Sequence, residues 1–130
     1  MGYTILLVDD SETIRLAIAR AIGMTDLVVD EILQAGNGKE ALAVLANKWV
    51  DIVFSDINMP EMNGIEFVTE LRASGEYAKL PVVIISTEGS KSRMDDLQSR
   101  GVNGYLRKPF TPEQLRDTVL GILGSWHGKN

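Results

Sequence analysis

Short aliphatic runs alternate along the chain with longer stretches in which apolar positions recur every three or four residues. The aliphatic runs predict buried strands, because they lack the polar alternation of a strand with one exposed face. The predicted strands are Thr4–Val8, roughly Glu31–Ala35, Asp51–Ser55, Pro81–Ser86 and Asn103–Leu106. Strands that alternate with amphipathic stretches are typical of a parallel sheet with helices on both faces.

The stretches between the strands carry helix periodicity and helix start signals. Apolar residues within 14–22 and within 115–123 follow the spacing of one buried helix face. Thr111 is the predicted N-cap of the last helix, with Pro112 in its first position and Gln114 completing a capping box. Two weaker N-cap candidates are Asn37 and Ser90. Five strand–helix pairs fill the length, so we expect one domain over 1–130 with its core at about 4–124.

Composition removes several classes of function. The 130 residues contain no cysteine, which excludes disulfides and thiolate chemistry, and the single histidine, His127, excludes a histidine metal cluster. Thirteen basic against 18 acidic residues give a net charge of −5 without a basic run, so nucleic acid is not an expected partner. No apolar run approaches the roughly 20 residues of a membrane helix, and no leader is evident, so we expect a cytoplasmic protein without membrane contact.

Polar residues follow four of the predicted strands. Asp9 and Asp10 end the first strand, Asp56 ends the third, Ser86 the fourth, and Lys108 follows the fifth. An aspartate after a strand is by itself more often a helix cap than a ligand. Since ligands bind outside the carboxyl ends of strands in open parallel sheets, the agreement of four strand ends predicts one functional site.

Three carboxylates gathered at one edge need a cation. Two carboxylates about 4 Å apart repel by about 4 kcal/mol at an effective dielectric of roughly 20. Oxygen ligands with room for water favour Mg²⁺ over Ca²⁺, because the chain lacks the closely spaced ligands of a calcium loop. A magnesium site beside a carboxylate, a lysine and a hydroxyl meets the needs of phosphoryl transfer, with Asp56 as nucleophile and Ser86 and Lys108 on the phosphoryl oxygens.

Taken together, these residues resemble the receiver domain of two-component response regulators over essentially the entire chain. The matching segments are 5–10 (ILLVDD), 56–60 (DINMP), 62–64 (MNG), 82–86 (VVIIS) and 104–110 (GYLRKPF). The resemblance implies a flavodoxin-like α/β fold, (βα)5, with strand order 2-1-3-4-5. It also implies that Asp56 accepts a phosphoryl group from a histidine kinase, that Ser86 and Lys108 contact that group, and that the Lys108–Pro109 peptide is cis.

The resemblance extends to the metal and to the class of activity. The implied metal ligands are Asp9, Asp10, Asp56 and the main-chain carbonyl of Asn58. Mg²⁺ is the implied cofactor, for which Mn²⁺ is expected to substitute. Such a protein catalyses only its own phosphotransfer and dephosphorylation, so it is not expected to be an enzyme acting on a separate substrate.

Among receivers, the chain is most similar to stand-alone chemotaxis regulators. Asn58 and Glu88 occupy positions that modulate the site in that group, and Thr87 stands where a smaller residue is usual. Ser86 and Tyr105 are the implied switch pair, which would change the face made by the fourth helix, fifth strand and fifth helix. The implied partners are a chemotaxis-type histidine kinase, a target such as a flagellar motor switch protein and a phosphatase, with the chain itself a monomer.

Other readings stay open at this point. The chain could be the receiver of a phosphorelay or of a pathway other than chemotaxis. An aspartyl-phosphate phosphohydrolase would also use Mg²⁺ and an aspartate nucleophile, although its D-x-D motif is absent after the first strand. An FMN-binding redox protein is disfavoured by the acidic loop 9–12, where phosphate would need N–H and hydroxyl donors. A scaffold without phosphorylation is disfavoured by the complete set of site residues.

Overall fold

The computed structural model describes residues 2–124, which form one parallel sheet covered by helices. The strands are β1 (Tyr3–Val8), β2 (Val29–Ala35), β3 (Ile52–Ser55), β4 (Val82–Ser86) and β5 (Gly104–Arg107). The helices are α1 (Glu12–Gly23), α2 (Gly38–Asn47), α3 (Gly64–Ala73), α4 (Lys91–Ser99), α5 (Pro112–Val119) and a π-helical turn, η1 (Leu120–Gly124). The strand order β2-β1-β3-β4-β5 confirms the predicted flavodoxin-like topology.

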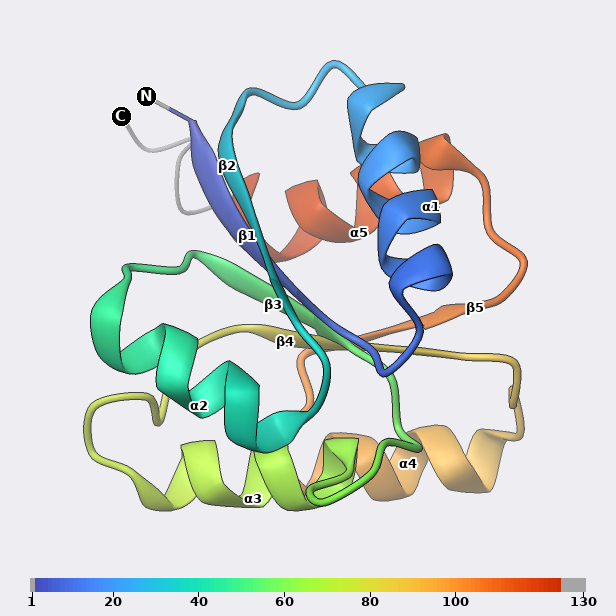
Figure 1. The fold of residues 1–130 in the computed structure, drawn as a ribbon. Coiled ribbons are helices and arrows are strands. Elements are labelled where there is room, and N and C mark those ends of the chain that lie inside the picture. The colour runs from blue at the N-terminus through green and yellow to red at the C-terminus, as the bar shows by residue number, and fades with distance from the viewer. Residues whose placement is uncertain (1, 125–130) are drawn as a thin grey trace.

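Helices cover both faces of this sheet, as Figure 1 shows, with α1 and α5 on one side and α2, α3 and α4 on the other. Each face has its own apolar cluster. Ile18, Ile22, Leu115 and Val119 join the α1/α5 side, whereas Leu45, Phe67 and Leu97 join the α2/α3/α4 side. The central strands are buried on both faces, and Leu6, Leu7, Val53 and Ile84 are fully inaccessible to solvent. This double burial explains the absence of polar alternation in the sequence.

The predicted helix starts are confirmed. Thr111 and Gln114 form the capping box of α5 with Pro112 in its first turn, and the side chains of Asn37 and Ser90 accept from the N–H groups of Glu40 and Arg93. The end of the last helix differs from the prediction, because residues 120–124 wind as a π-helix. Gly121 and Gly124 lie in that stretch, and glycine is a poor α-helix former.

The second strand is longer than predicted, and each of the other four differs from its predicted bounds by one residue at one or both ends. β2 begins at Val29, where it pairs with the start of β1. β3 begins at Ile52, because the carboxylate of Asp51 caps the sheet edge by accepting from the Thr4 N–H at 2.7 Å. β4 begins after Pro81, which has no N–H to donate, and β5 extends to Arg107.

The strand register brings the polar strand ends together. Val8 pairs with Ala35 on one side and with Ser55 on the other, so Asp9 and Asp56 follow directly at neighbouring strand ends. Ser86 pairs with Arg107 and accepts on its carbonyl from the Lys108 N–H at 2.8 Å. The parallel arrangement therefore places five predicted site residues at one edge of the sheet.

Candidate functional site

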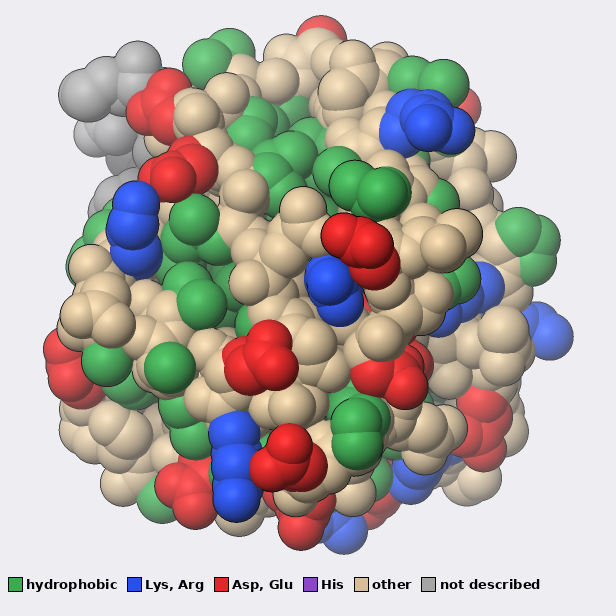
Figure 2. All heavy atoms as spheres, viewed as in Figure 1, with side chains coloured by type: hydrophobic (Ala, Val, Ile, Leu, Met, Phe, Trp, Pro, Cys, Tyr) green, Lys and Arg blue, Asp and Glu red, His purple; other side chains and the backbone are tan. Residues whose placement is uncertain are grey.

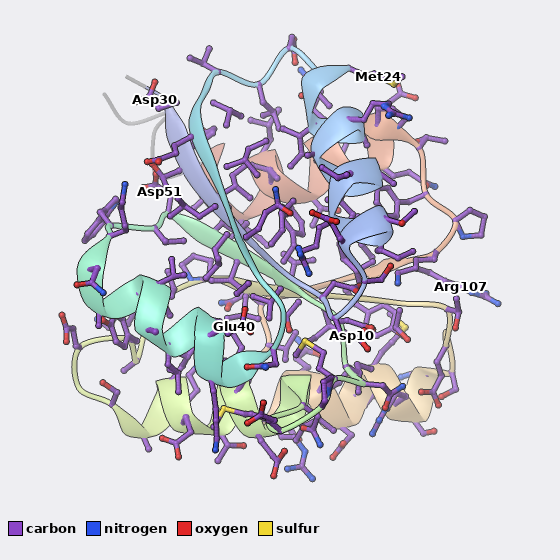
Figure 3. All side chains as sticks on the ribbon, viewed as in Figure 1. Asp10, Met24, Asp30, Glu40, Asp51 and Arg107 are labelled. Carbon is purple, nitrogen blue, oxygen red and sulfur yellow. The ribbon has the colours of Figure 1, made fainter. Side chains whose placement is uncertain are left out.

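Three aspartates meet at the carboxyl edge of β1 and β3. One carboxylate oxygen from each of Asp9, Asp10 and Asp56 lies within 4.8 Å of the other two. Asp9 is buried, Asp56 is half-buried and Asp10 is exposed, so the cluster opens to solvent on one side. Figure 3 shows Asp10 where β1 turns into α1. Hard oxygen donors on an open edge fit a Mg²⁺ ion that keeps several waters.

Backbone contacts fix the two inner aspartates. The N–H of Asp9 donates to Ala35 and that of Asp56 donates to Val8, at 3.1 and 2.9 Å. Asp9 Oδ1 accepts from the Ser11 N–H at 2.9 Å, and Asp56 Oδ1 accepts from the Ile57 N–H at 2.8 Å. Each carboxylate thus has one oxygen held by the backbone, while Asp56 Oδ2 makes no hydrogen bond among residues 2–124.

A glycine allows α3 to start directly against the third strand end. The N–H of Gly64 donates to the Ile57 carbonyl at 2.7 Å, and a Cβ at Gly64 would lie only 2.3 Å from the Asp56 carbonyl oxygen. Any side chain here would push the loop that carries Asp56 away from the sheet edge. The Asn-Gly pair at 63–64 is therefore a packing requirement of the site, with Asn63 also forming the capping box of α3.

Lys108 is the one basic side chain among the described residues that forms an ion pair with a member of the aspartate cluster, namely Asp9. Its Nζ lies 3.8 Å from Asp9 Oδ2, and its side chain is 22% exposed. Burial, first of all, raises the pKa of Asp9, and the charges of Asp56 and Asp10 raise it further. The Ser11 N–H and Lys108 act in the opposite direction. A raised pKa means that the folded protein holds this carboxylate in an unfavourable environment, which a bound cation would relieve.

The other predicted site residues surround this cluster with differing exposure. Ser86 is 7% exposed, and its Oγ accepts from the Glu88 N–H at 3.1 Å. It forms no hydrogen bond with the three aspartates. Asn58, Thr87 and Glu88 are exposed at the rim. The Lys108–Pro109 peptide is cis. His127 lies outside the described residues.

Tyr105 is half-buried on β5, and its hydroxyl is buried without a hydrogen-bond partner among residues 2–124. The implied switch pair, Ser86 and Tyr105, is therefore not joined by a hydrogen bond in this structure. The ring packs against the α2/α3/α4 cluster. An unpaired buried hydroxyl has an unfavourable environment, which is a feature of elements that change conformation.

Two arginine contacts near the site were missed from the sequence. Arg15 of α1 donates from Nη1 to the Asp9 carbonyl and from Nε to Gln34 Oε1 at 2.9 Å. Arg93 of α4 pairs with Glu88 at 3.3 Å. The only sequence signal for the contact of Arg15 is the position of a basic residue shortly after the acidic pair Asp9 and Asp10. No local pattern identifies Gln34 of β2 as the second acceptor of its guanidinium.

The fold is an open α/β sheet, the class of protein in which ligands bind outside the carboxyl ends of the strands. The three aspartates at that edge could hold a metal ion. Comparison with known proteins is more specific, since residues 5–120 match the family described as response regulator receiver domain. The chain belongs to this family.

Individual relatives cover nearly the whole chain. The chain is 40% identical over 126 residues to a chemotaxis protein CheY homolog of Campylobacter jejuni, covering 96% of this chain and 95% of that protein. It is 38% identical over 122 residues to chemotaxis protein CheY1 of Helicobacter pylori, covering 93% and 97%. The solved structure of chemotaxis response regulator CheY4 of Vibrio cholerae superposes with a TM-score of 0.82 at 34% identity, covering 95% and 100%.

The surface and the helices add two further facts. On the face drawn in Figure 2, basic and acidic side chains are interspersed and no continuous basic patch is present. None of the helices between residues 2 and 124 has the length and apolar character needed to cross a membrane.

Proposed function

We propose that this chain is the phosphoacceptor of a two-component system, with Asp56 as the residue that is phosphorylated in a magnesium-dependent reaction. The observation that carries the proposal is the meeting of Asp9, Asp10 and Asp56 within 4.8 Å, with Lys108 beside them. The half-burial of Asp56 leaves its free Oδ2 open to a donor. As a receiver, the chain is a signalling protein, and we propose that it catalyses only its own phosphotransfer and dephosphorylation.

The transfer is an in-line displacement at phosphorus. Asp56 Oδ2 would form the new O–P bond while the P–N bond to the histidine of the kinase breaks, and the departing imidazole nitrogen takes a proton from solvent. Asp9, Asp10, Asp56 and the Asn58 carbonyl are the proposed ligands of Mg²⁺, which when bound neutralises charge on the phosphoryl oxygens. Lys108 Nζ is proposed to pair with one phosphoryl oxygen, and the Ser86 hydroxyl to donate to another.

The rim residues and the switch belong to the same proposal. Asn58, Thr87 and Glu88 are exposed around the site, which suits a role in setting the rates at which donor and water arrive. If the Ser86 side chain moved toward the phosphoryl group, the hydrogen bond between its Oγ and the Glu88 N–H would break. Tyr105 would then shift its position. The face made by α4, β5 and α5 would then present a different surface to a partner.

A histidine kinase upstream and a target protein downstream follow from membership of the family. Chemotaxis is the proposed pathway, supported by the relatives at 38 and 40% identity whose names place them there. A chemotaxis-type kinase, a flagellar motor switch protein as target and a phosphatase are the proposed partners. A cytoplasmic location, a monomeric resting state and one receiver domain over residues 1–130 stay predictions.

The test is intact mass after incubation with Mg²⁺ and a small acyl phosphate. We expect one added phosphoryl group on the wild type, none with EDTA and none on Asp56→Asn. Asp51→Asn is the matched control, since this aspartate flanks the other end of β3 and should leave the adduct unchanged. An adduct on Asp56→Asn, or continuous release of phosphate from unrelated phosphate esters, would contradict the proposal.

A further inference from the structure

Arg15 makes a bridge that lies next to the aspartate cluster without joining it. Its Nη1 donates to the main-chain carbonyl of Asp9, and its Nε donates to Gln34 Oε1 at 2.9 Å. One guanidinium thus ties α1 to the carboxyl ends of β1 and β2. Hydrogen bonds from a charged donor are about twice as strong as neutral ones, and the planar guanidinium fixes both directions at once.

The carbonyl that Arg15 holds belongs to the peptide joining Asp9 to Asp10. The N–H of Asp9 is already held by Ala35 at 3.1 Å, and Asp9 Oδ1 accepts from the Ser11 N–H at 2.9 Å. Asp10 has no comparable support. Its side chain is exposed, and its carboxylate makes no hydrogen bond or ion pair within residues 2–124. The direction of Asp10 toward the cluster therefore depends on the peptide that precedes it.

We propose that Arg15 is a positioning residue of the cation site, because its bond to the Asp9 carbonyl orients the Asp9–Asp10 peptide and so brings the Asp10 carboxylate toward Asp9 and Asp56. Gln34 completes the arrangement by holding the other side of the guanidinium. The inference rests on the proposed function, since the cation concerned is the Mg²⁺ of the phosphoryl-transfer site. Groups that orient metal ligands from outside the coordination sphere change metal affinity by about 10–100-fold when removed.

The charge of Arg15 and its hydrogen bond to the Asp9 carbonyl are expected to change the affinity for Mg²⁺ in opposite directions. A cation beside three carboxylates repels Mg²⁺, so removal of the charge alone would tighten metal binding. Removal of the positioning bond would weaken it. The sign of the change in affinity consequently distinguishes the two roles.

The experiment is a Mg²⁺ titration of the full chain, followed by backbone amide NMR shifts, which reports the Kd independently of phosphorylation. We expect Arg15→Gln to weaken Mg²⁺ binding about tenfold. Arg15→Lys keeps the charge but reaches only one acceptor, so we expect a loss of about threefold. Gln34→Met changes no charge and removes only the second acceptor, and we also expect a loss of about threefold.

Arg20→Gln is the matched control, because Arg20 is exposed in the last turn of the same helix and its removal takes the same charge from α1. We expect an unchanged or slightly lower Kd for this variant. An unchanged or tighter Kd in both Arg15→Gln and Gln34→Met would overturn the positioning role while leaving the proposed function intact. A wild type that binds no Mg²⁺ would overturn the proposed function and the role of Arg15 with it.

Phosphorylation gives a second readout. If Arg15 acts through the metal, the slower labelling of Arg15→Gln by acyl phosphate should return to the wild-type rate at saturating Mg²⁺. A rate that stays low at saturating Mg²⁺ would show that Arg15 acts on the phosphoryl donor and would overturn the positioning role. Gln34→Met preserves α1 and the charge of Arg15, so it keeps the test decisive if Arg15→Gln folds poorly.

Discussion

The two ends of β3 each carry an aspartate, and the surroundings of the two carboxylates differ. Asp51, before the strand, accepts from the Thr4 N–H at 2.7 Å on one oxygen and from the Trp49 indole N–H at 3.0 Å on the other. Asp56, after the strand, has one oxygen held by its neighbour's N–H and faces two further carboxylates. Figure 3 shows Asp51 and Asp10 at opposite ends of the sheet.

Two tyrosines repeat the contrast. The hydroxyl of Tyr77, in the segment before β4, donates to the Leu45 carbonyl at 2.8 Å, whereas that of Tyr105 on β5 has no partner in the described part of the chain. At the amino edge of the sheet, Asp51 and Tyr77 are hydrogen-bonded within the protein. In contrast, the second oxygen of Asp56 and the Tyr105 hydroxyl have no hydrogen-bond partner among residues 2–124. Unmet polar groups in a folded protein mark the places where a ligand or a conformational change completes the structure.

The largest stability difference should come from one substitution made at both ends of β3. Asp51→Asn places an amide N–H₂ against one of two N–H donors, so we expect the free energy of unfolding to fall by about 1–3 kcal/mol. Asp56→Asn retains an acceptor for the Ile57 N–H and removes a charge from the cluster, so we expect stability to be unchanged or higher by about 1 kcal/mol. Urea denaturation in metal-free buffer measures both. Equal losses in the two variants would break the comparison.

Much of this contrast could be predicted from the sequence, because it follows from strand order. Asp9, Asp10, Asp56, Ser86 and Lys108 each end a recognisable buried strand, and parallel strands place such ends at one edge. The environment of each group could not be predicted, since it depends on contacts between distant elements. Nothing in the local pattern showed that Arg15 meets Gln34 or that the Tyr105 hydroxyl lacks a partner.

Magnesium should stabilise the carboxyl edge and leave the amino edge unaffected. At ten times its Kd, a ligand that binds only the folded state adds about 1.4 kcal/mol to the free energy of unfolding. We expect this gain in the wild type and in Asp51→Asn, and a reduced gain in Asp56→Asn. Thermal unfolding with and without Mg²⁺ is the measurement, with K⁺ at matched ionic strength as control. A full gain in Asp56→Asn would place the cation elsewhere.

The tyrosine pair should give a smaller effect of the same kind. Tyr77→Phe removes a hydrogen bond to the Leu45 carbonyl, and we expect a loss of about 1 kcal/mol. Tyr105→Phe removes a hydroxyl that is buried and has no partner among the described residues, so we expect no loss and up to about 1 kcal/mol of gain. Both variants delete the same atom, and urea denaturation compares them directly. A larger loss for Tyr105→Phe would show that its hydroxyl is paired in solution.

The smallest effect should come from a surface ion pair in which the protein again satisfies a carboxylate. Asp26, in the loop between α1 and β2, accepts from Arg116 of α5 at 2.6 Å, and the hydrogen bond and charge of Arg116 lower the pKa of Asp26 from its ordinary value of 3.8. The pKa of Asp9 changes in the opposite direction, because burial raises it.

The sign of the pH effect follows from proton binding. Because the folded state binds a proton at Asp26 less readily than the unfolded state, the pair stabilises the protein fully above pH 3.8, and this contribution is lost as pH falls through the lowered pKa. Asp26→Asn should therefore be slightly less stable than the wild type at neutral pH and equally stable once Asp26 is protonated in both states. Thermal unfolding along a pH series checks this, and added salt should shrink the neutral-pH difference, since both side chains are exposed. If the difference persisted unchanged into acid, the pair would not be its source, and the contrast between satisfied and unsatisfied carboxylates would have to rest on Asp51 and Asp56 alone.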